Sequence, residues 1–103
     1  MNYAFRMKLK PGATAEYKRR HDEIWPELKQ LLSESGIHDY SIFLDEENLH
    51  LFAVLKLRDQ NQRDLLPGHP LMRRWWNHMQ DLMYTQPDGR PHEWPLTPLF
   101  HLD

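Results

Sequence analysis

The 103-residue sequence lacks cysteine altogether. A disulfide framework, a thiolate metal site and a cysteine nucleophile are therefore excluded. The sequence also lacks an excess of charge of either sign, because 13 basic residues stand against 15 acidic ones and the net charge is −2. Nucleic-acid-binding domains usually carry a strongly basic surface. The charge balance gives no electrostatic reason to expect a nucleic-acid partner.

Long apolar runs and glycine-rich loops are missing too. No stretch approaches the roughly 20 apolar residues that a membrane-spanning helix needs. The N-terminal segment MNYAFRMKLKPG alternates apolar and polar residues and has no apolar core of the kind found in signal peptides. The four glycines form no loop that could hold a phosphate. We therefore expect a cytoplasmic protein without a membrane partner or a nucleotide.

The sequence is rich in aromatic and histidine side chains, with four Trp, four Tyr, four Phe and seven His. Large aromatic side chains belong in a core, an interface or a ligand pocket. A chain of this length can bury roughly two-thirds of its unfolded surface, so we expect residues 1–103 to form a single domain. The histidines are scattered and form no HxxxH or HExxH pair, so no metal or other cofactor is expected.

Hydrophobic periodicity predicts a strand and a helix in the first third of the chain. Residues 3–10 alternate between apolar and polar side chains, as a half-buried strand does. From Thr14 to Gly36 the inward positions follow helical spacing, and they are Tyr17, His21, Ile24, Leu28 and Leu31. Pro26 lies inside this stretch. Because proline has no N–H and crowds the preceding turn, we expect either a kink at Pro26 or a second helix that begins there.

Two strands follow, over residues 37–45 and 49–57, joined by a polar turn. The second strand is apolar on both faces, with Phe52 and Val54 on the side opposite its leucines. A strand of this kind is typical of the centre of a sheet that is covered on both sides.

The last third of the chain predicts one more helix and a closing strand. Residues 59–69 are polar, with room for a short helix, and Pro70 can open a longer one. The apolar stripe of this helix is Met72, Trp75, Met79 and Leu82. The proline-rich residues 85–95 predict a loop. Residues 96–103 predict a short strand at a sheet edge, because Pro98 cannot donate to a central ladder.

The predicted order is strand, helix, strand, strand, helix, strand. It indicates an α+β fold of the ferredoxin-like βαββαβ type, an antiparallel sheet with two helices on one face. Two helices leave the other face of the sheet bare, although the strand over residues 49–57 is apolar on that side too. We therefore expect the bare face to pack against a second copy of the chain, in a homodimer of the dimeric α/β barrel type.

His21 is the first candidate for chemistry because it lies on the inward stripe one turn after Tyr17. Residues four apart on a helix are neighbours, so the imidazole and the phenol would project together toward the sheet. Histidine titrates near neutral pH, and a tyrosine hydroxyl both donates and accepts hydrogen bonds. The pair fits either a general acid or base beside a hydroxyl group, or a core histidine bonded to a backbone carbonyl.

Trp75, Trp76 and Tyr40 are the other candidates. Adjacent residues of a helix point about 100° apart, so one tryptophan can pack inward while the other lines a cleft. Such a pair makes a wall for a sugar ring or another flat, amphipathic ligand, or else two core aromatics. Tyr40 lies on the same side of its strand as Ile42 and Leu44. If that side faces the helices, the Tyr40 hydroxyl needs a partner from the protein or from a ligand.

Four segments resemble the L-rhamnose mutarotase family, in the same order along essentially the whole chain. They are YKRRHDEIWPEL at 17–28, YSIFLD at 40–45, RWWNHM at 74–79 and LFHLD at 99–103. The resemblance implies a homodimer of the βαββαβ fold that interconverts the α and β anomers of L-rhamnose without a cofactor. It also implies that His21 is the proton donor and that the sugar contacts are Tyr17, Tyr40, Trp75 and Trp76.

Anomer interconversion needs one proton delivered to the ring oxygen while another leaves the anomeric hydroxyl, which acid–base groups near neutral pH can provide. We expect His21 to donate to the ring oxygen and Tyr17 or Tyr40 to orient a hydroxyl. The group that removes the anomeric proton stays open. The chain departs from the family in residues 59–69 and 85–95, which leaves the sugar open between L-rhamnose and relatives such as L-fucose.

Other function classes stay open at the level of sequence. One is a cofactor-independent monooxygenase of the dimeric ferredoxin-like type, which also holds aromatics and a histidine between helices and sheet. Another is a small-ligand-binding domain in which Trp75 and Trp76 form the wall and nothing turns over. The scattered histidines also leave a metal-binding option, which insensitivity of the activity to a chelator would remove.

Overall fold

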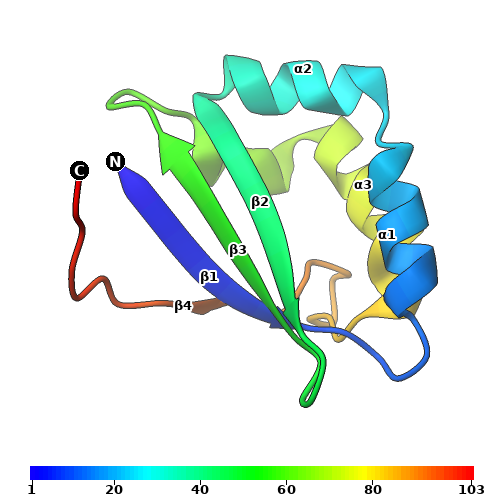
Figure 1. Cartoon of the computed structure of the whole chain (residues 1–103). Helices are drawn as coiled ribbons and strands as arrows, with labels where there is room; N and C mark the ends of the chain where they lie inside the picture. Colours follow the sequence, from blue (N-terminus) through cyan, green and yellow to red (C-terminus); the bar gives the residue numbers. More distant parts are fainter.

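A four-stranded antiparallel sheet forms one layer of the molecule (Figure 1). The computed structural model describes residues 1–103, and its strands are β1 (Asn2–Lys8), β2 (Ile37–Asp45), β3 (His50–Leu57) and β4 (Trp94–Pro95). They lie in the order β2-β3-β1-β4, with each neighbouring pair antiparallel. This order is the ferredoxin-like arrangement, so the predicted fold class is confirmed.

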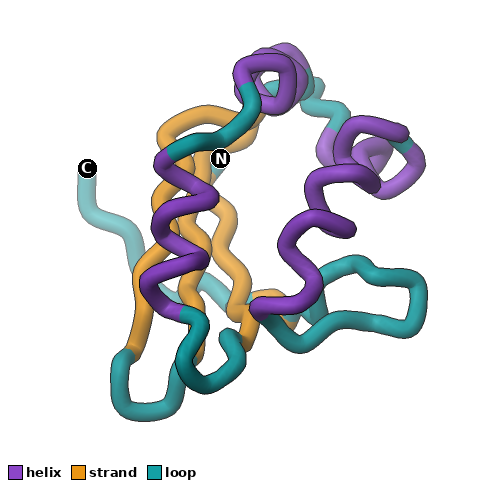
Figure 2. The backbone as a smooth tube through the Cα atoms, turned by 90° about the vertical axis from the view of Figure 1, so that its right-hand side faces the viewer, coloured by secondary structure: helices purple, strands orange, loops and turns teal.

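The helices α1 (Thr14–Asp22), α2 (Pro26–Glu34) and α3 (Pro70–Met79) lie on one side of the sheet. Figure 2 shows α1 in front of the strands, with α2 nearly end-on above it and α3 beside it. A 3₁₀ turn over Arg63–Gly68 precedes α3, which confirms the short helix expected in the polar stretch. None of the helices combines the length and the apolar character that crossing a bilayer demands.

The first helical stretch is two helices rather than one kinked helix. α1 ends at Asp22, Trp25 is extended (φ −61°, ψ 131°), and Pro26 is the first residue of α2. The residue before a proline is driven out of the helical region, and a proline at the first helical position loses no hydrogen bond. Of the two outcomes that the sequence allowed, the restart is the observed one. The break turns the chain shortly after His21.

β3 is central, as predicted, but only one of its faces is covered within the chain. The side chains that face the helices are buried, and they are Leu51, Ala53, Leu55 and Leu57. On the opposite face Val54 is 41% exposed, and Phe43 of the neighbouring strand is 62% exposed. Phe43 pairs in register with Phe52. We call Phe43, Phe52 and Val54 the outer strip.

The closing strand lies earlier than the sequence predicts. It consists of Trp94–Pro95, inside the segment predicted to be a loop, and residues 96–103 form no strand, so that prediction is wrong. β4 pairs with β1, and the Leu96 N–H donates to the Ala4 carbonyl at 3.0 Å. Because Pro98 has no N–H, it interrupts any continuation of this ladder.

Candidate active site

A cavity of about 810 Å³ lies between the helices and the sheet. All the residues that the sequence singles out for a site line it, and they are Tyr17, His21, Tyr40, Trp75 and Trp76. They come from α1, β2 and α3, which are far apart along the chain. The fold therefore brings the whole predicted set together, in a volume of the size that small-molecule sites have.

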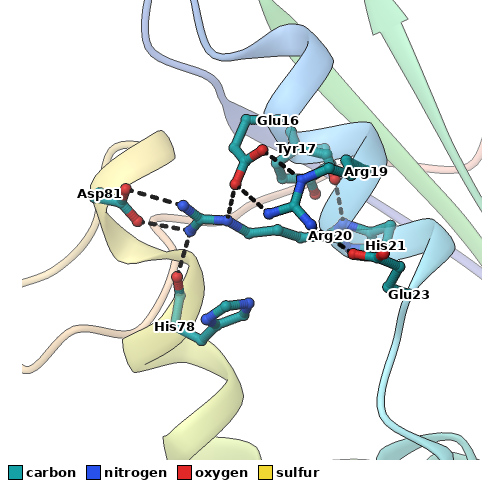
Figure 3. Close-up of polar contacts among 8 residues, drawn as sticks. All are labelled: Glu16, Tyr17, Arg19, Arg20, His21, Glu23, His78 and Asp81. Atoms are coloured by element: carbon teal, nitrogen blue, oxygen red, sulfur yellow. Dashed lines mark hydrogen bonds and ion pairs between the residues drawn. The ribbon is translucent and has the colours of Figure 1, made fainter.

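His21 and Tyr17 are neighbours on α1, as the four-residue spacing predicts. Their rings stack with centroids 4.4 Å apart and planes 28° from parallel. His21 Nδ1 lies 3.1 Å from the carbonyl oxygen of Tyr17, a contact drawn in Figure 3. A carbonyl can only accept, so Nδ1 carries the hydrogen in this contact. Nε2 is then the nitrogen of the ring that gains and loses a proton.

Burial sets the ionisation of the groups around the cavity. It lowers the pKa of His21 from its ordinary 6.5, and the bond to the Tyr17 carbonyl offsets this only in part. Burial also raises the pKa of the Tyr17 hydroxyl, with the nearby Tyr40 adding to the effect. Tyr40 is 39% exposed as a residue, yet the protein around its hydroxyl raises the pKa of that group as well. At neutral pH the site thus holds a mostly neutral imidazole and two neutral phenols.

α3 provides an aromatic wall. Trp75 is 5% exposed, and its ring meets His21 edge-on at 5.4 Å and Trp25 edge-on at 5.1 Å. Edge-to-face contacts of this kind are favourable and fix the angle between the rings. Trp76 is only half-buried and also lines the cavity. Trp75 therefore holds the imidazole in place, while Trp76 is free to contact a ligand.

Arg20 fastens α1 to the end of α3, which the sequence did not predict (Figure 3). Its guanidinium donates to Glu16 at 2.8 Å on α1, and to Asp81 at 2.8 Å and the His78 carbonyl at 2.6 Å across the gap. Hydrogen bonds from Arg19 and Arg20 lower the pKa of Glu16 to about 2. Glu16 and Arg20 stand four residues apart, a spacing at which helical side chains meet, but no local pattern connects residue 20 with residue 81.

Loss of the Arg20 contacts is expected to disturb the site from a distance. Arg20→Met removes the bonds between α1 and α3, so His21 and Trp75 lose their fixed spacing. A misplacement of about 1 Å can cost up to ~100-fold in rate. We expect kcat/KM to fall by ~10–100-fold. The measurement is the initial rate of the anomer interconversion that the resemblance to the mutarotase family implies.

Arg19→Met is the matched control for this substitution. Arg19 pairs only with Glu16 on α1 and with Glu23 directly after its end, and the Arg19 side chain is 57% exposed. Its removal should leave kcat/KM within about twofold, because exposed pairs of this kind contribute little. Equal losses in both variants would show that the link between the helices does not position the site.

The sequence did not single out several polar residues of the cavity, and four of these are Arg63, Gln86, Arg90 and Glu93. They come from the two segments that carry no periodic pattern. Arg63 Nη2 lies 3.4 Å from a carboxylate oxygen of Glu93. Burial raises the pKa of Glu93 from its ordinary value, against the lowering effect of the Arg63 charge.

The arrangement suits proton transfer on a polyhydroxy ligand. Apolar and aromatic walls match the faces of a sugar ring, and the neutral phenols can donate to or accept from hydroxyl groups. One imidazole nitrogen is available to exchange a proton. No group of three or more His, Asp or Glu side chains is placed to hold a metal ion.

The chain is similar to proteins of one named family. A family model described as L-rhamnose mutarotase matches residues 2–102. Relatives with that name come from Flavobacterium johnsoniae, 61% identical over 97% of this chain and 94% of their own, and from Jannaschia sp., 57% identical over 97% and 96%. The crystal structure of an L-rhamnose mutarotase from Formosa agariphila is 42% identical, with a TM-score of 0.93 over 100% of this chain and 99% of that one. A Mycobacterium tuberculosis structure, 18% identical with a TM-score of 0.60, shares the fold.

Proposed function

The chain belongs to the L-rhamnose mutarotase family, and we propose that it interconverts the α and β anomers of L-rhamnose in the cavity lined by His21. It is an isomerase, and the comparisons do not favour the monooxygenase or binding-domain alternatives. The observation that supports the proposal most strongly is that His21 and all four predicted sugar contacts line the same cavity. These roles come from the resemblance and from the geometry together.

The reaction breaks and remakes one C–O bond. A proton reaches the ring oxygen as another leaves the anomeric hydroxyl, and the bond between C1 and the ring oxygen breaks to give the open-chain aldehyde. Rotation about the C1–C2 bond presents the other face of the carbonyl. Closure then returns both protons by the reverse steps, and no electrons are exchanged with a cofactor.

His21 is assigned the proton that reaches the ring oxygen. Its Nδ1–H is held by the Tyr17 carbonyl at 3.1 Å, so Nε2 is the nitrogen that can donate when the ring is protonated. A pKa lowered by burial makes the imidazolium a stronger acid, while a smaller share of the ring is protonated at neutral pH. Tyr17 and Tyr40 are assigned to orienting hydroxyl groups, and Trp75 with Trp76 to the apolar face of the sugar.

The direct test of the function is a sugar panel. Addition of the protein to freshly dissolved, anomerically pure L-rhamnose should speed the approach to anomeric equilibrium, followed by NMR or polarimetry. L-Rhamnose is expected to have a higher kcat/KM than L-fucose. Acceleration of neither sugar would refute the proposal, and a preference for L-fucose would correct the substrate.

The proton-donor role predicts that activity rises as the pH falls. Because the pKa of His21 lies below 6.5, little of the ring is imidazolium at pH 7. If the imidazolium donates, kcat/KM increases about tenfold per pH unit on the alkaline side of that pKa and levels off below it. The profile should be measured from about pH 5 to 8, with the His21 titration followed by NMR. A profile that falls as the pH drops would instead make His21 the base.

We also propose that two chains associate through their sheets. The outer strip leaves Phe43 and Val54 exposed on the face of the sheet opposite the helices. Burying such a strip against its two-fold copy is the usual way for a sheet of this kind to form a closed dimer. Sedimentation should give twice the chain mass of 12.5 kDa.

The dimer proposal predicts that Val54→Glu produces a monomer, because the charge would be buried without a partner. Leu65→Glu is the control, since Leu65 is 69% exposed in the 3₁₀ turn before α3. A monomeric wild type, or a Val54→Glu variant that stays dimeric, would reject this interface.

The cytoplasmic location expected from the sequence stays a prediction, which fractionation of the native cells would test.

A further inference from the structure

An ion pair that the proposed reaction does not use lines the same cavity. Arg63 comes from the 3₁₀ turn before α3, and Glu93 directly precedes β4. Their side chains are 21% and 32% exposed, so both are largely enclosed. Enclosed charges are costly to keep, and they are usually paired or committed to a ligand.

Arg63 is held in place by aromatic rings rather than by a full set of hydrogen bonds. Its guanidinium carbon lies 4.5 Å from the Tyr3 ring centroid and 5.1 Å from that of Phe5, both on β1. These cation–π contacts fix the group without using its N–H donors. The only side-chain hydrogen bond of Arg63 goes to Glu93.

The pair itself is incomplete. One nitrogen of Arg63 meets one oxygen of Glu93 at 3.4 Å, whereas a two-pronged arginine–carboxylate pair makes two shorter bonds. Within the chain, Glu93 Oε1 accepts no hydrogen bond, and Nε and Nη1 of Arg63 donate none from the side chain. Glu93 therefore keeps a free hydrogen-bond acceptor and Arg63 keeps free donors, and both residues line the cavity.

The pair and the imidazole contact different parts of the fold: Arg63 lies over aromatic rings of β1, whereas His21 contacts Tyr17 on α1 and Trp75 on α3. The charges of Glu93 and Arg63 both act on the pKa of Tyr40, and Tyr40 in turn acts on that of Tyr17. The groups that act on His21 are Tyr17 and Asp22 instead. The charges of the pair therefore act on Tyr40, one of the predicted sugar contacts, and not on His21. Arg90, from the loop before β4, is the other charge that acts on Glu93.

We propose that Arg63 and Glu93 form a subsite that binds the ring hydroxyls of the sugar remote from its anomeric carbon and thereby selects among sugars. A sugar hydroxyl both donates and accepts, so it can donate to Glu93 Oε1 and accept from Arg63. A carboxylate only accepts and a guanidinium only donates, so the subsite rejects a sugar that lacks a hydroxyl at that place. The inference rests on the proposed function, because it takes the cavity to be the sugar site.

Glu93→Gln tests the subsite, with three L-rhamnose analogues that each lack one hydroxyl, at C2, C3 or C4. The subsite binds the ground state and the transition state alike, so KM for L-rhamnose should rise ~10–100-fold with kcat within about threefold. One of the three analogues lacks the hydroxyl that Glu93 binds. For that analogue, wild type and variant should have the same kcat/KM, because the interaction is already absent. Arg63→Met should reproduce this pattern.

Glu34→Gln is the matched control, because Glu34 is exposed at the end of α2 and bonds only to Gln30. It should leave all four sugars unaffected. The subsite is refuted if Glu93→Gln changes nothing, if it weakens all three analogues equally, or if it lowers kcat without raising KM. The last result would make Glu93 the base that removes the anomeric proton.

Failure of the subsite and failure of the proposed function give different results. Quenching of tryptophan fluorescence by each sugar measures binding without turnover. If the wild type interconverts no anomers, the function fails, and the binding titrations still show whether Glu93 discriminates among the analogues. Circular dichroism confirms the fold, and Glu93→Asp, which keeps the charge, replaces the amide variant if that one does not fold.

Discussion

His21→Ala is expected to lower kcat for anomer interconversion by ~100–10,000-fold, the usual contribution of one positioned acid or base. The fold should persist, because His21 is only half-buried and lies at the last turn of α1. KM should change little, since the phenols and the tryptophans that we propose as sugar contacts remain. The measurement is the initial rate of anomerisation of L-rhamnose, corrected for the spontaneous reaction.

His101→Ala is the control for the loss of an imidazole. His101 lies in the exposed C-terminal tail and bonds to Asn2 and Asp103. Its removal should leave kcat unchanged. A folded His21→Ala variant with kcat within threefold of wild type would show that the imidazole does not transfer the proton.

Trp75→Ala is expected to cost the fold about 3–5 kcal/mol, the range found when a buried aromatic is truncated. Trp75 is 5% exposed and contacts three other rings, those of His21, Trp25 and His78. Its loss opens a cavity between α1 and α3 and leaves the imidazole without the ring that fixes its angle. The free energy of unfolding from urea titration measures the first effect, and kcat measures the second.

Trp76→Ala separates the two roles of the tryptophan pair. Trp76 is half-buried, so its removal should destabilise the fold by less than ~2 kcal/mol and act mainly on KM, through the lost apolar wall. The account of the aromatic wall fails if Trp75→Ala is as stable as Trp76→Ala. It also fails if the two variants change KM and kcat in the same proportion.

The parts of the site that lie on regular elements could be predicted from the sequence. Tyr17 and His21 stand four apart on a helix, and Tyr40 shares a strand face with Ile42 and Leu44, so periodicity places their side chains. The observed strand order confirms the predicted element order, and the cavity lies between the helices and the sheet of that fold. Trp75 and Trp76 follow from their helical positions in the same way.

The parts that depend on irregular segments could not be predicted. Arg63 and Glu93 lie in a 3₁₀ turn and at the end of a proline-rich stretch, where no period links residue number to direction. β4 was placed too late because its two residues, Trp94–Pro95, carry no alternation. The Arg20–Asp81 contact joins residues 61 apart in sequence, which only the packed fold brings together.

Pro26 shows how a single residue left two structures possible. A kinked helix and a restarted helix both place the same apolar side chains inward. The two structures differ in the backbone of Trp25, which is extended in the restart. In the restart its extended backbone releases the indole to pack edge-on against Trp75 at 5.1 Å. The local proline rules are compatible with the restart, but this contact is tertiary, so the sequence pattern could not reveal it.

Saturation-transfer NMR at anomeric equilibrium tests the central claim most directly. Saturating the α-anomer H1 signal of L-rhamnose should reduce the β-anomer H1 signal in the presence of wild-type protein. The same experiment with folded His21→Ala should show no transfer beyond that of the sugar alone. Absence of transfer with the wild type, or equal transfer with both proteins, would contradict the account of an anomer-interconverting site centred on His21.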